Sequence, residues 1–226
     1  MTVNFLRHAS WVGPEQLDMP LNIIGCGAIG SNLALLAAKM GFYDLILWDP
    51  DVVEAHNLPN QAFDHHHVNQ PKVVALEEVL KRFNPEIKVT THQDYFTPEH
   101  KGLVEGILFI ATDTMSSRQS IAEAFRLKPL IDAVYEVRIG FDYGEINYID
   151  HTSTKTIESW LNGLRSDEEV EEGPCSLRIC ATLVGIIVAE AVHMMCAQHA
   201  LTTEDWQPPK KTLFCLTPEL QVHTIK

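Results

Sequence analysis

Apolar residues along the chain alternate between short continuous runs and longer stretches in which apolar positions recur with helical spacing. The short runs predict strands buried on both faces, and they cover residues 21–24, 45–48, 87–89, 106–110 and 130–134. The helical stretches cover 28–39, 69–84, a brief turn at 97–99, and 116–125. Asn69 is expected to cap the second helix, with Pro71 in its first turn. This alternation predicts an α/β protein with a Rossmann-like, doubly wound and mostly parallel sheet.

The pattern changes after about residue 135. Alternating apolar and polar residues over 138–149, around Asp142-Tyr143-Gly144, predict an antiparallel hairpin added to the sheet. An acidic segment at about 151–174 is expected to be a long exposed crossover, followed by a mostly buried helix at 176–198 and closing strands at 211–216 and 220–225. We therefore expect a single domain over 1–226, with a Rossmann-like half at 20–135 and the added elements at 136–226.

Charge and cysteine content narrow the possible partners and cofactors. The chain has 17 Lys and Arg against 30 Asp and Glu, a net charge of −13, and no basic run. A nucleic-acid backbone would be repelled, so nucleic acid is an unfavoured partner. The longest apolar stretch, 180–197, is interrupted by Thr182, Glu190 and His193, which argues against a membrane span. Five cysteines without a CxxC pair predict a reducing, cytoplasmic location and no zinc site.

A glycine motif directly after the first predicted strand carries the clearest chemical signal. It reads Gly25-Cys26-Gly27-Ala28-Ile29-Gly30 and opens the first helix, which is the context that the GxGxxG fingerprint requires. The first glycine allows a tight turn, the second a close approach to phosphate, and the third close packing of helix on strand. The helix N-terminus adds unpaired N–H groups. Asp49, at the end of the second strand, is placed to accept hydrogen bonds from a ribose, so the motif predicts a nucleotide site.

Further motifs indicate which class of nucleotide-binding protein this is. After the second strand the chain carries Asp49, Asp51, Asn57-Leu58 and Gln61, then Lys72 on the next helix, Asn84-Pro85 at its end, and Thr112-Asp113-Thr114 with Arg118 after the fourth strand. In this order and spacing they resemble the ThiF/MoeB/HesA family of ubiquitin-activating-enzyme-like adenylyltransferases, over about residues 21–135. The resemblance implies ATP-dependent adenylation of a carboxylate with release of pyrophosphate. The classical substrate is the C-terminal glycine of a ubiquitin-like or sulfur-carrier protein.

The resemblance also implies roles for individual residues. Asp49 would hold the ribose, Asn57 and Lys72 the phosphates, and Asp113 a Mg²⁺ ion that offsets phosphate charge. Lys72, Asp113 and Arg118 are the catalytic candidates. The full set expected to contact nucleotide is Gly25, Gly27, Ala28, Ile29, Gly30, Asp49, Asp51, Asn57, Asn60, Gln61, Lys72, Asp113 and Thr114. The family's habit further implies a homodimer.

Several positions depart from the family pattern. Asn60 stands where the family has arginine, so a guanidinium able to fork onto phosphate is replaced by a short neutral amide. Thr114 stands in place of the usual asparagine after the metal aspartate. The four zinc cysteines of many members are absent. The family's helical N-terminal extension is absent or shortened, which leaves Arg7 as the one candidate there for the arginine given to a partner's site.

Two residue types leave alternatives open. Cys175 precedes the long helix, where relatives that form a thioester place a cysteine; a helix N-terminus favours thiolate, but Cys175 also fits a buried small residue. Cys180 and Cys196 in the apolar helix and Cys26 in the glycine loop are expected to be core residues. The run His65-His66-His67 is expected to bind metal only adventitiously, because consecutive side chains point in different directions.

Three functions are compatible with these motifs. The first is an adenylating enzyme, whose carboxylate could also belong to a small molecule or a modified tRNA base. The second is a catalytically impaired binding or scaffold subunit, which the loss of arginine at Asn60 favours. The third is a nicotinamide-dependent oxidoreductase, which has no need of a metal aspartate after the fourth strand. Retention of Lys72, Asp113 and Arg118 favours the first.

Overall fold

The protein was analysed as a computed structural model that describes residues 1–226 except 1–2, 8–9, 141–142, 165–176, 201–207 and 216–219. In these described parts one eight-stranded sheet runs in the order β3-β2-β1-β4-β5-β6-β7-β8. The strands are β1 Leu21–Ile24, β2 Asp44–Trp48, β3 Lys88–His92, β4 Gly106–Ile110, β5 Ile131–Ile139, β6 Tyr143–Ile149, β7 Lys211–Cys215 and β8 Gln221–Ile225. β1 to β5 pair in parallel, and β6 to β8 pair antiparallel. The expected α/β class and mostly parallel sheet are confirmed.

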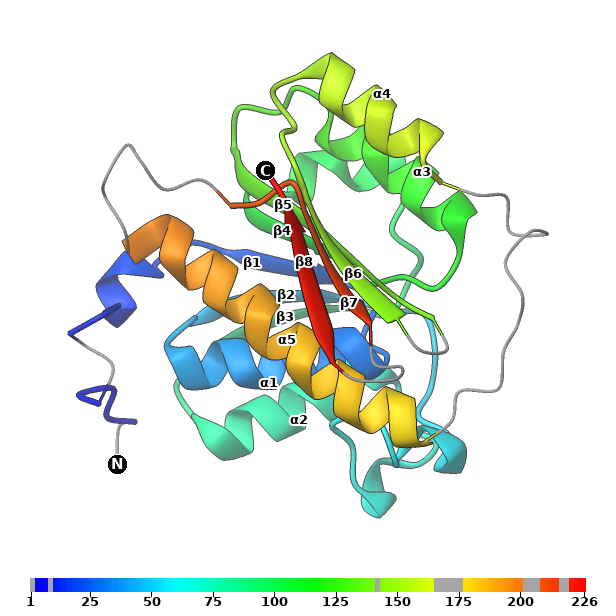
Figure 1. The fold of residues 1–226 in the computed structure, drawn as a ribbon. Coiled ribbons are helices and arrows are strands. Elements are labelled where there is room, and N and C mark those ends of the chain that lie inside the picture. The colour runs from blue at the N-terminus through cyan, green and yellow to red at the C-terminus, as the bar shows by residue number, and fades with distance from the viewer. Residues whose placement is uncertain (1–2, 8–9, 141–142, 165–176, 201–207, 216–219) are drawn as a thin grey trace.

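Helices cover both faces of the sheet, which makes three layers (Figure 1). One face carries α1 Ala28–Met40, α2 Lys72–Phe83 and α5 Leu177–Ala200, whose apolar residues share a core with Leu21, Leu45 and Phe109. The other carries α3 Met115–Phe125 and α4 Thr154–Asn162, packed on Leu108 and Val134. Short 3₁₀ turns complete the fold at η1 Pro14–Gln16, η2 Ala55–Asn57, η3 His65–His67 and η4 Pro98–Leu103. Because helices lie on both faces, the sheet is doubly wound, with the carboxyl ends of β1, β2 and β4 at one edge.

The start of α2 differs from the prediction. Asn69 does not cap the helix: it adopts a positive φ of 72°, and the cap is Pro71. The reason is a backbone contact that the sequence does not reveal. The amide of Asn69 donates to the carbonyl of Val53, and the amide of Val53 donates to the carbonyl of Gln70. This pairing ties the segment before α2 to the loop after β2 and delays the helix until Lys72.

The fifth strand and the hairpin also differ from the prediction. The sequence predicted a strand at 130–134 and a separate hairpin at 138–149, whereas β5 is one continuous strand that forms both the predicted strand and the first arm of the hairpin, and β6 forms the second arm. Its first half pairs in parallel with β4, and Val134 to Ile139 pairs antiparallel with β6. A strand has two edges, so one strand can take a parallel and an antiparallel neighbour at once.

Part of the expected exposed crossover is instead a packed helix. Residues 154–162 form α4, which begins at the Ser153 cap and buries Ile157 and Trp160 against the α3 face of the sheet. The acidity of the whole segment obscured this amphipathic pattern. The following residues, 165–176, lie outside the described parts of the chain.

The burial of Ile157 provides a test of this packing. Its side chain is 0% exposed, so Ile157→Ala should lower the free energy of unfolding by about 2–5 kcal/mol through lost apolar contact and a cavity. Glu158→Ala, one residue along on the exposed side of α4, is the matched control and should change stability by less than about 0.5 kcal/mol. Urea unfolding measures both. Equal stabilities for the two variants would mean that α4 does not pack as described.

Candidate functional site

The glycine motif forms the turn between β1 and α1. Gly25 adopts a φ of +95°, and a Cβ there would lie 2.6 Å from the carbonyl oxygen of Ala111, just after β4. A Cβ at Gly30 would lie 1.8 Å from the carbonyl oxygen of Gly25. Gly27 caps the N-terminus of α1, and no atom lies within 4 Å of where its Cβ would be. The open space at Gly27 faces unpaired helix amides, and this combination fits a phosphate group.

Asp49 closes the other side of this turn. Its Oδ2 accepts from the amide of Cys26 at 2.7 Å, and its Oδ1 accepts from the amide of Asp51 at 2.9 Å. The side chain is buried, and burial raises its pKa, although Lys72 and the Cys26 amide oppose the rise. A carboxylate oxygen has more than one acceptor direction, so Asp49 can still accept from a ligand hydroxyl.

Lys72 lies at the first position of α2 and faces both aspartates. Its Nζ is 2.7 Å from Asp51 Oδ2 and 3.8 Å from Asp49 Oδ1. Burial alone would lower the pKa of Lys72, but the carboxylates of Asp49 and Asp51 outweigh it and raise the pKa. Lys72 is therefore a protonated cation, fixed by the two carboxylates at the carboxyl ends of the strands. Asp51, which is half exposed, is the partner that a phosphate could replace.

The segment after η2 is fastened to α1 by two residues that the sequence analysis did not single out. Ser31 Oγ accepts from the amide of Ala62 at 3.0 Å, and Asn32 Nδ2 donates to the carbonyl of Asn60 at 2.9 Å. In the sequence, these two residues could have been recognised as polar side chains inside an otherwise apolar helix. The bonds bring Asn60 and Gln61 to the glycine turn. Gln61 Oε1 is buried without a hydrogen-bond partner, which suits a residue awaiting a ligand donor.

Two residues assigned to nucleotide binding have structural bonds of their own. Asn57 Oδ1 accepts from the amide of Glu54 at 2.9 Å and completes the capping box of η2. Thr114 caps α3, where its Oγ1 accepts from the amide of Ser117 and donates to Ser117 Oγ. Asp113, between β4 and this cap, presents an exposed carboxylate. Contact of any of them with nucleotide stays a prediction.

Arg118, one of the three catalytic candidates, lies in a buried ion pair. Its Nε lies 3.0 Å from Glu136 Oε1, and both side chains are buried, at 4% and 0% exposed. One terminal nitrogen, Nη2, donates to the carbonyls of both Thr112 and Val137. Burial lowers the pKa of Arg118, and the Glu136 carboxylate opposes that fall. Arg118 thus lies beneath the loop that carries Asp113.

Glu136 is the centre of a buried polar cluster that the sequence analysis missed. Besides Arg118, it accepts from Arg138 Nε at 2.6 Å, Asn147 Nδ2 at 2.7 Å and Trp160 Nε1 at 3.4 Å. Glu145 extends the cluster, with Arg138 and Lys211 at 3.2 Å and 3.0 Å. The available signal was the recurrence of charged residues at alternate positions of apolar strands, Glu136 and Arg138 on β5.

Side chains of the histidine run at η3 have polar partners within the protein. Asp64, His66 and His67 lie close enough for their ligand atoms to approach one ion. Arg82, however, donates to Asp64 Oδ2 at 3.2 Å and lies 3.0 Å from His66 Nε2. His67 Nδ1 accepts from the amide of Asp64 at 2.8 Å, so the neutral ring carries its proton on Nε2 and lacks a lone pair there. A guanidinium therefore occupies the place of a cation, and the geometry argues against a built metal site.

His67 predicts a pH dependence of stability. Burial lowers its pKa, so the folded state favours the neutral ring, and the contribution of His67 is complete above the unfolded pKa of about 6.5. It is lost as pH falls below that value, because the unfolded chain takes up the proton first. Urea unfolding at pH 7.5 and 5.5 should show a smaller difference for His67→Asn than for wild type. The exposed His56→Asn is the control, and an unchanged difference in His67→Asn would contradict the assignment.

Two of the described cysteines match the sequence prediction of core residues. Cys26 and Cys196 are buried core residues, and burial raises the pKa of Cys196 to about 12. Desolvation also raises the pKa of Cys26 well above its usual value. Neither thiol has thiolate character. Cys175 and the side chain of Cys180 lie outside the described residues.

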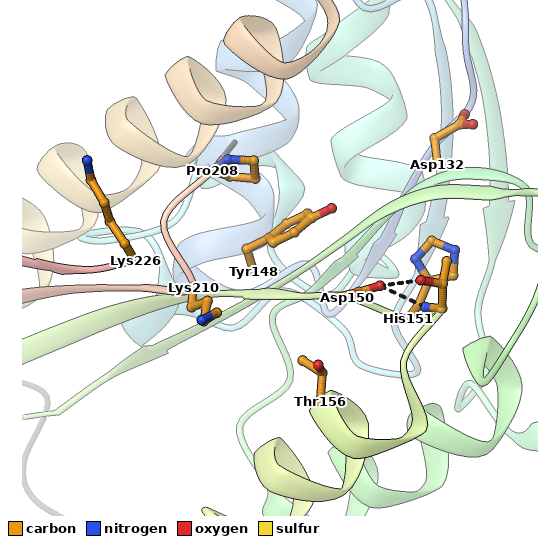
Figure 2. Close-up of a pocket in the computed structure, with 9 residues that line it drawn as sticks. Asp132, Tyr148, Asp150, His151, Thr156, Pro208, Lys210 and Lys226 are labelled. Carbon is orange, nitrogen blue, oxygen red and sulfur yellow. Dashed lines mark hydrogen bonds between the residues drawn. The ribbon is translucent and has the colours of Figure 1, made fainter. Parts of the chain in front are cut away.

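A cavity of ≈ 610 Å³ opens at the other edge of the sheet (Figure 2). It is lined by Asp132 at the start of β5, by Tyr148, Asp150 and His151 at the end of β6, and by Lys210 and Lys226 among others. Asp150 is held by the amide and hydroxyl of Thr152 at 3.0 Å and 2.6 Å. β5 runs parallel to β4 and β1, so its start lies at the amino ends of these strands, whereas the glycine turn lies at their carboxyl ends. This cavity is therefore separate from the residues that carry the nucleotide motifs.

The fold is that of a Rossmann-like α/β protein with an open glycine turn at the N-terminus of its first helix. A family model described as the ThiF family matches residues 17–225, so the chain belongs to that family.

None of the helices in the described residues is long and apolar enough to cross a membrane.

Individual relatives are more distant and longer. The chain is 35% identical over 114 residues to the sulfur carrier protein ThiS adenylyltransferase of Escherichia coli, covering 49% of this chain and 45% of that protein. It is 29% identical over 132 residues to the mouse ubiquitin-like modifier-activating enzyme 6, covering 51% and 12%. The uba4 adenylyltransferase and sulfurtransferase of Aspergillus niger is 32% identical over 117 residues, covering 49% and 24%. The chain thus spans less than half the length of these relatives.

Solved structures share the fold. A structure of PaaA superposes with a TM-score of 0.71 at 19% identity, covering 94% of this chain and 66% of that one. E. coli MccB with AMPCPP and MccA superposes with a TM-score of 0.69 at 17% identity, covering 93% and 64%. At these identities the likeness concerns the fold alone.

Proposed function

We propose that this protein catalyses ATP-dependent adenylation of a carboxylate, most favourably the C-terminal glycine of a ubiquitin-like or sulfur-carrier protein. The observation that carries the proposal is the convergence of three features at one sheet edge: the open cradle at Gly27, the held cation Lys72 and the exposed carboxylate of Asp113. Relatives named as adenylyltransferases support the reaction class, and MccB, whose solved structures include complexes with ATP and with MccA, supports a nucleotide ligand.

The proposed chemistry requires little of the protein beyond placement and electrostatics. A carboxylate oxygen of the substrate forms a bond to the α-phosphorus of ATP, the bond from that phosphorus to the bridging oxygen breaks, and pyrophosphate leaves. The attacking group is already an anion, so no proton has to be removed. The protein can still accelerate the reaction in two ways: by placing the carboxylate in line with the bond that breaks, and by stabilising the negative charge that develops on the phosphate oxygens.

The residues of the site divide this work. The amides at the start of α1 receive a phosphate over Gly27, and Asp49 accepts from a ribose hydroxyl. Lys72 exchanges Asp51 for a phosphate oxygen. Asp113 offers the oxygen ligand that Mg²⁺ prefers, and the metal would supply neutralisation of phosphate charge. The net charge of −13 makes these local cations necessary.

A scaffold role is the second candidate, and Asn60 is the observation that favours it. The family's arginine is replaced there by an amide, which removes one guanidinium from the phosphate site. In the scaffold proposal the chain binds ATP or a carrier protein without forming AMP. Homodimer assembly and a thioester at Cys175 are further proposals that the family relationship supports.

One assay separates the two candidates. The chain is incubated with Mg-ATP and a panel of proteins ending in Gly-Gly, and AMP and pyrophosphate are measured. Adenylation predicts both products with at least one carrier, and Cys175→Ser should abolish any protein thioester while sparing pyrophosphate release. Tight ATP binding without AMP for every carrier favours the scaffold. Preference for NADH over ATP would reject both in favour of an oxidoreductase.

A further inference from the structure

Arg118 belongs to the motif that carries Asp113, and its contacts point to a particular task. The guanidinium is enclosed by α3, β5 and the loop after β4. Its Nε faces Glu136 at 3.0 Å, one terminal nitrogen lies 3.0 Å from Met115 Sδ, and the other reaches the carbonyls of Thr112 and Val137. At 4% exposed, and with these contacts all directed into the protein, the guanidinium is placed to act on the groups around it rather than on a ligand at the surface.

The anion opposite Arg118 is held from several sides. Glu136 accepts hydrogen bonds from β5, β6 and α4, and it forms an ion pair with Arg118 of α3. Both of its carboxylate oxygens are engaged, which is what a fully buried carboxylate requires. A guanidinium paired with this carboxylate cannot move far without leaving a buried charge uncompensated. Arg118 is thereby a rigid support.

The group that Arg118 supports is the backbone that carries Asp113. Thr112, whose carbonyl accepts from Arg118, directly precedes Asp113. On its other side the same backbone lies against the glycine turn: the ideal Cβ position of Gly25 is 2.6 Å from Ala111 O and 3.1 Å from Thr112 N. The amide of Ala111 also donates to the carbonyl of Ile24 at 2.8 Å. The chain leaving β4 is thus held between Arg118 and the proposed phosphate cradle.

We infer that Arg118 is a positioning residue: anchored by Glu136, it holds the Thr112 backbone so that the Asp113 carboxylate is presented beside the glycine turn. The placement itself stands on the contacts above, whereas its consequence for metal and nucleotide rests on the proposed function. The two are therefore tested separately.

The first test needs no nucleotide. Hydrogen exchange of the full chain is followed by NMR in wild type, Arg118→Lys and Glu136→Gln. Lysine keeps a positive charge, but its single nitrogen cannot both face Glu136 and reach the carbonyls as Nε and Nη2 of arginine do. The Ala111 amide should exchange about tenfold faster or more in Arg118→Lys through local opening. The Gly25 amide, which donates to Trp48 on the far side of β1, is the internal reference, and Arg126→Lys at the other end of α3 is the matched control.

The second test uses the proposed reaction. Arg118→Lys and Glu136→Gln should raise the Mg²⁺ concentration for half-maximal AMP formation about tenfold or more, because a displaced ligand weakens metal binding, while metal-free affinity for a fluorescent ATP analogue stays near wild type. Binding of Mn²⁺ to the protein with bound nucleotide, followed by electron paramagnetic resonance, should weaken in parallel.

The outcomes separate the two hypotheses. Unchanged exchange at Ala111 relative to Gly25 in both variants overturns the positioning role, whatever the enzyme does. Faster exchange in a chain that forms no AMP supports the placement and rejects adenylation instead. In an active enzyme, a loss of metal-free nucleotide affinity in Arg118→Lys would make Arg118 a phosphate ligand and overturn the inference. Faster exchange with unchanged Mg²⁺ and Mn²⁺ dependence would overturn it as well, reducing Arg118 to a structural support.

Discussion

Replacement of Asp113 by alanine is expected to lower the rate of AMP formation by about 100-fold or more, because charge stabilisation at the reacting phosphate is the main lever left to the protein. Stability should hardly change, since the Asp113 side chain is exposed on the loop between β4 and α3. The measurements are pyrophosphate release under saturating Mg-ATP and the midpoint of thermal unfolding.

Asp132→Ala is the matched control for this prediction. Asp132 is also an exposed aspartate, but it lies at the start of β5, at the opposite edge of the sheet. Its replacement removes the same charge from the molecule and should leave the rate within about twofold of wild type, because exposed charges at this distance are largely screened. If the two variants are equally active, Asp113 is not part of the reacting site.

Two glycines of the same motif should respond in opposite ways to the same added methyl group. Gly30→Ala places a Cβ 1.8 Å from the Gly25 carbonyl oxygen, which the backbone cannot relieve locally, so the free energy of unfolding should fall by about 3 kcal/mol or more. Gly27→Ala meets no atom within 4 Å, and its effect on stability should stay within about 1 kcal/mol.

The methyl group at Gly27 should act on the ligand instead. It would fill the open space over the first turn of α1, so affinity for ATP should fall about tenfold or more through lost contact of phosphate with the helix amides. Urea unfolding and titration with a fluorescent ATP analogue measure the pair. Full ATP affinity in Gly27→Ala would falsify the assignment of this space to phosphate.

The parallel half of the sheet and its glycine turn were accessible from the sequence because their signals are local. Glycines at fixed spacing allow one turn between β1 and α1, and continuous apolar runs such as Gly106–Ile110 indicate strands buried on both faces. Lys72 and Asp49 were expected to share a site because both belong to one ordered family pattern. The structure brings them within 3.8 Å.

The errors arose where a residue's partner is distant in the chain. The buried pairing of Arg118 was not foreseen, because its motif position gave no information about Glu136 on β5. Asn69 was assigned to a cap because the pairing of Val53 with Gln70 is not visible in either segment. The helix α4 was missed because the acidity of its surroundings outweighed two buried positions, Ile157 and Trp160.

By itself, the sequence determined the α/β class, the alternation of strands and helices, and the position of the glycine turn, since these depend on periodicity and on backbone conformations that particular residues allow. Only the tertiary structure decided which charged groups are buried together and which remain open to a ligand. That distinction depends on long-range register: Glu136 lies opposite the end of β4, where burial makes its pairing with Arg118 obligatory, while Asp113, three residues beyond Ile110, emerges into solvent. Desolvation acts on groups assembled in space, so it could not be assigned from their order along the chain.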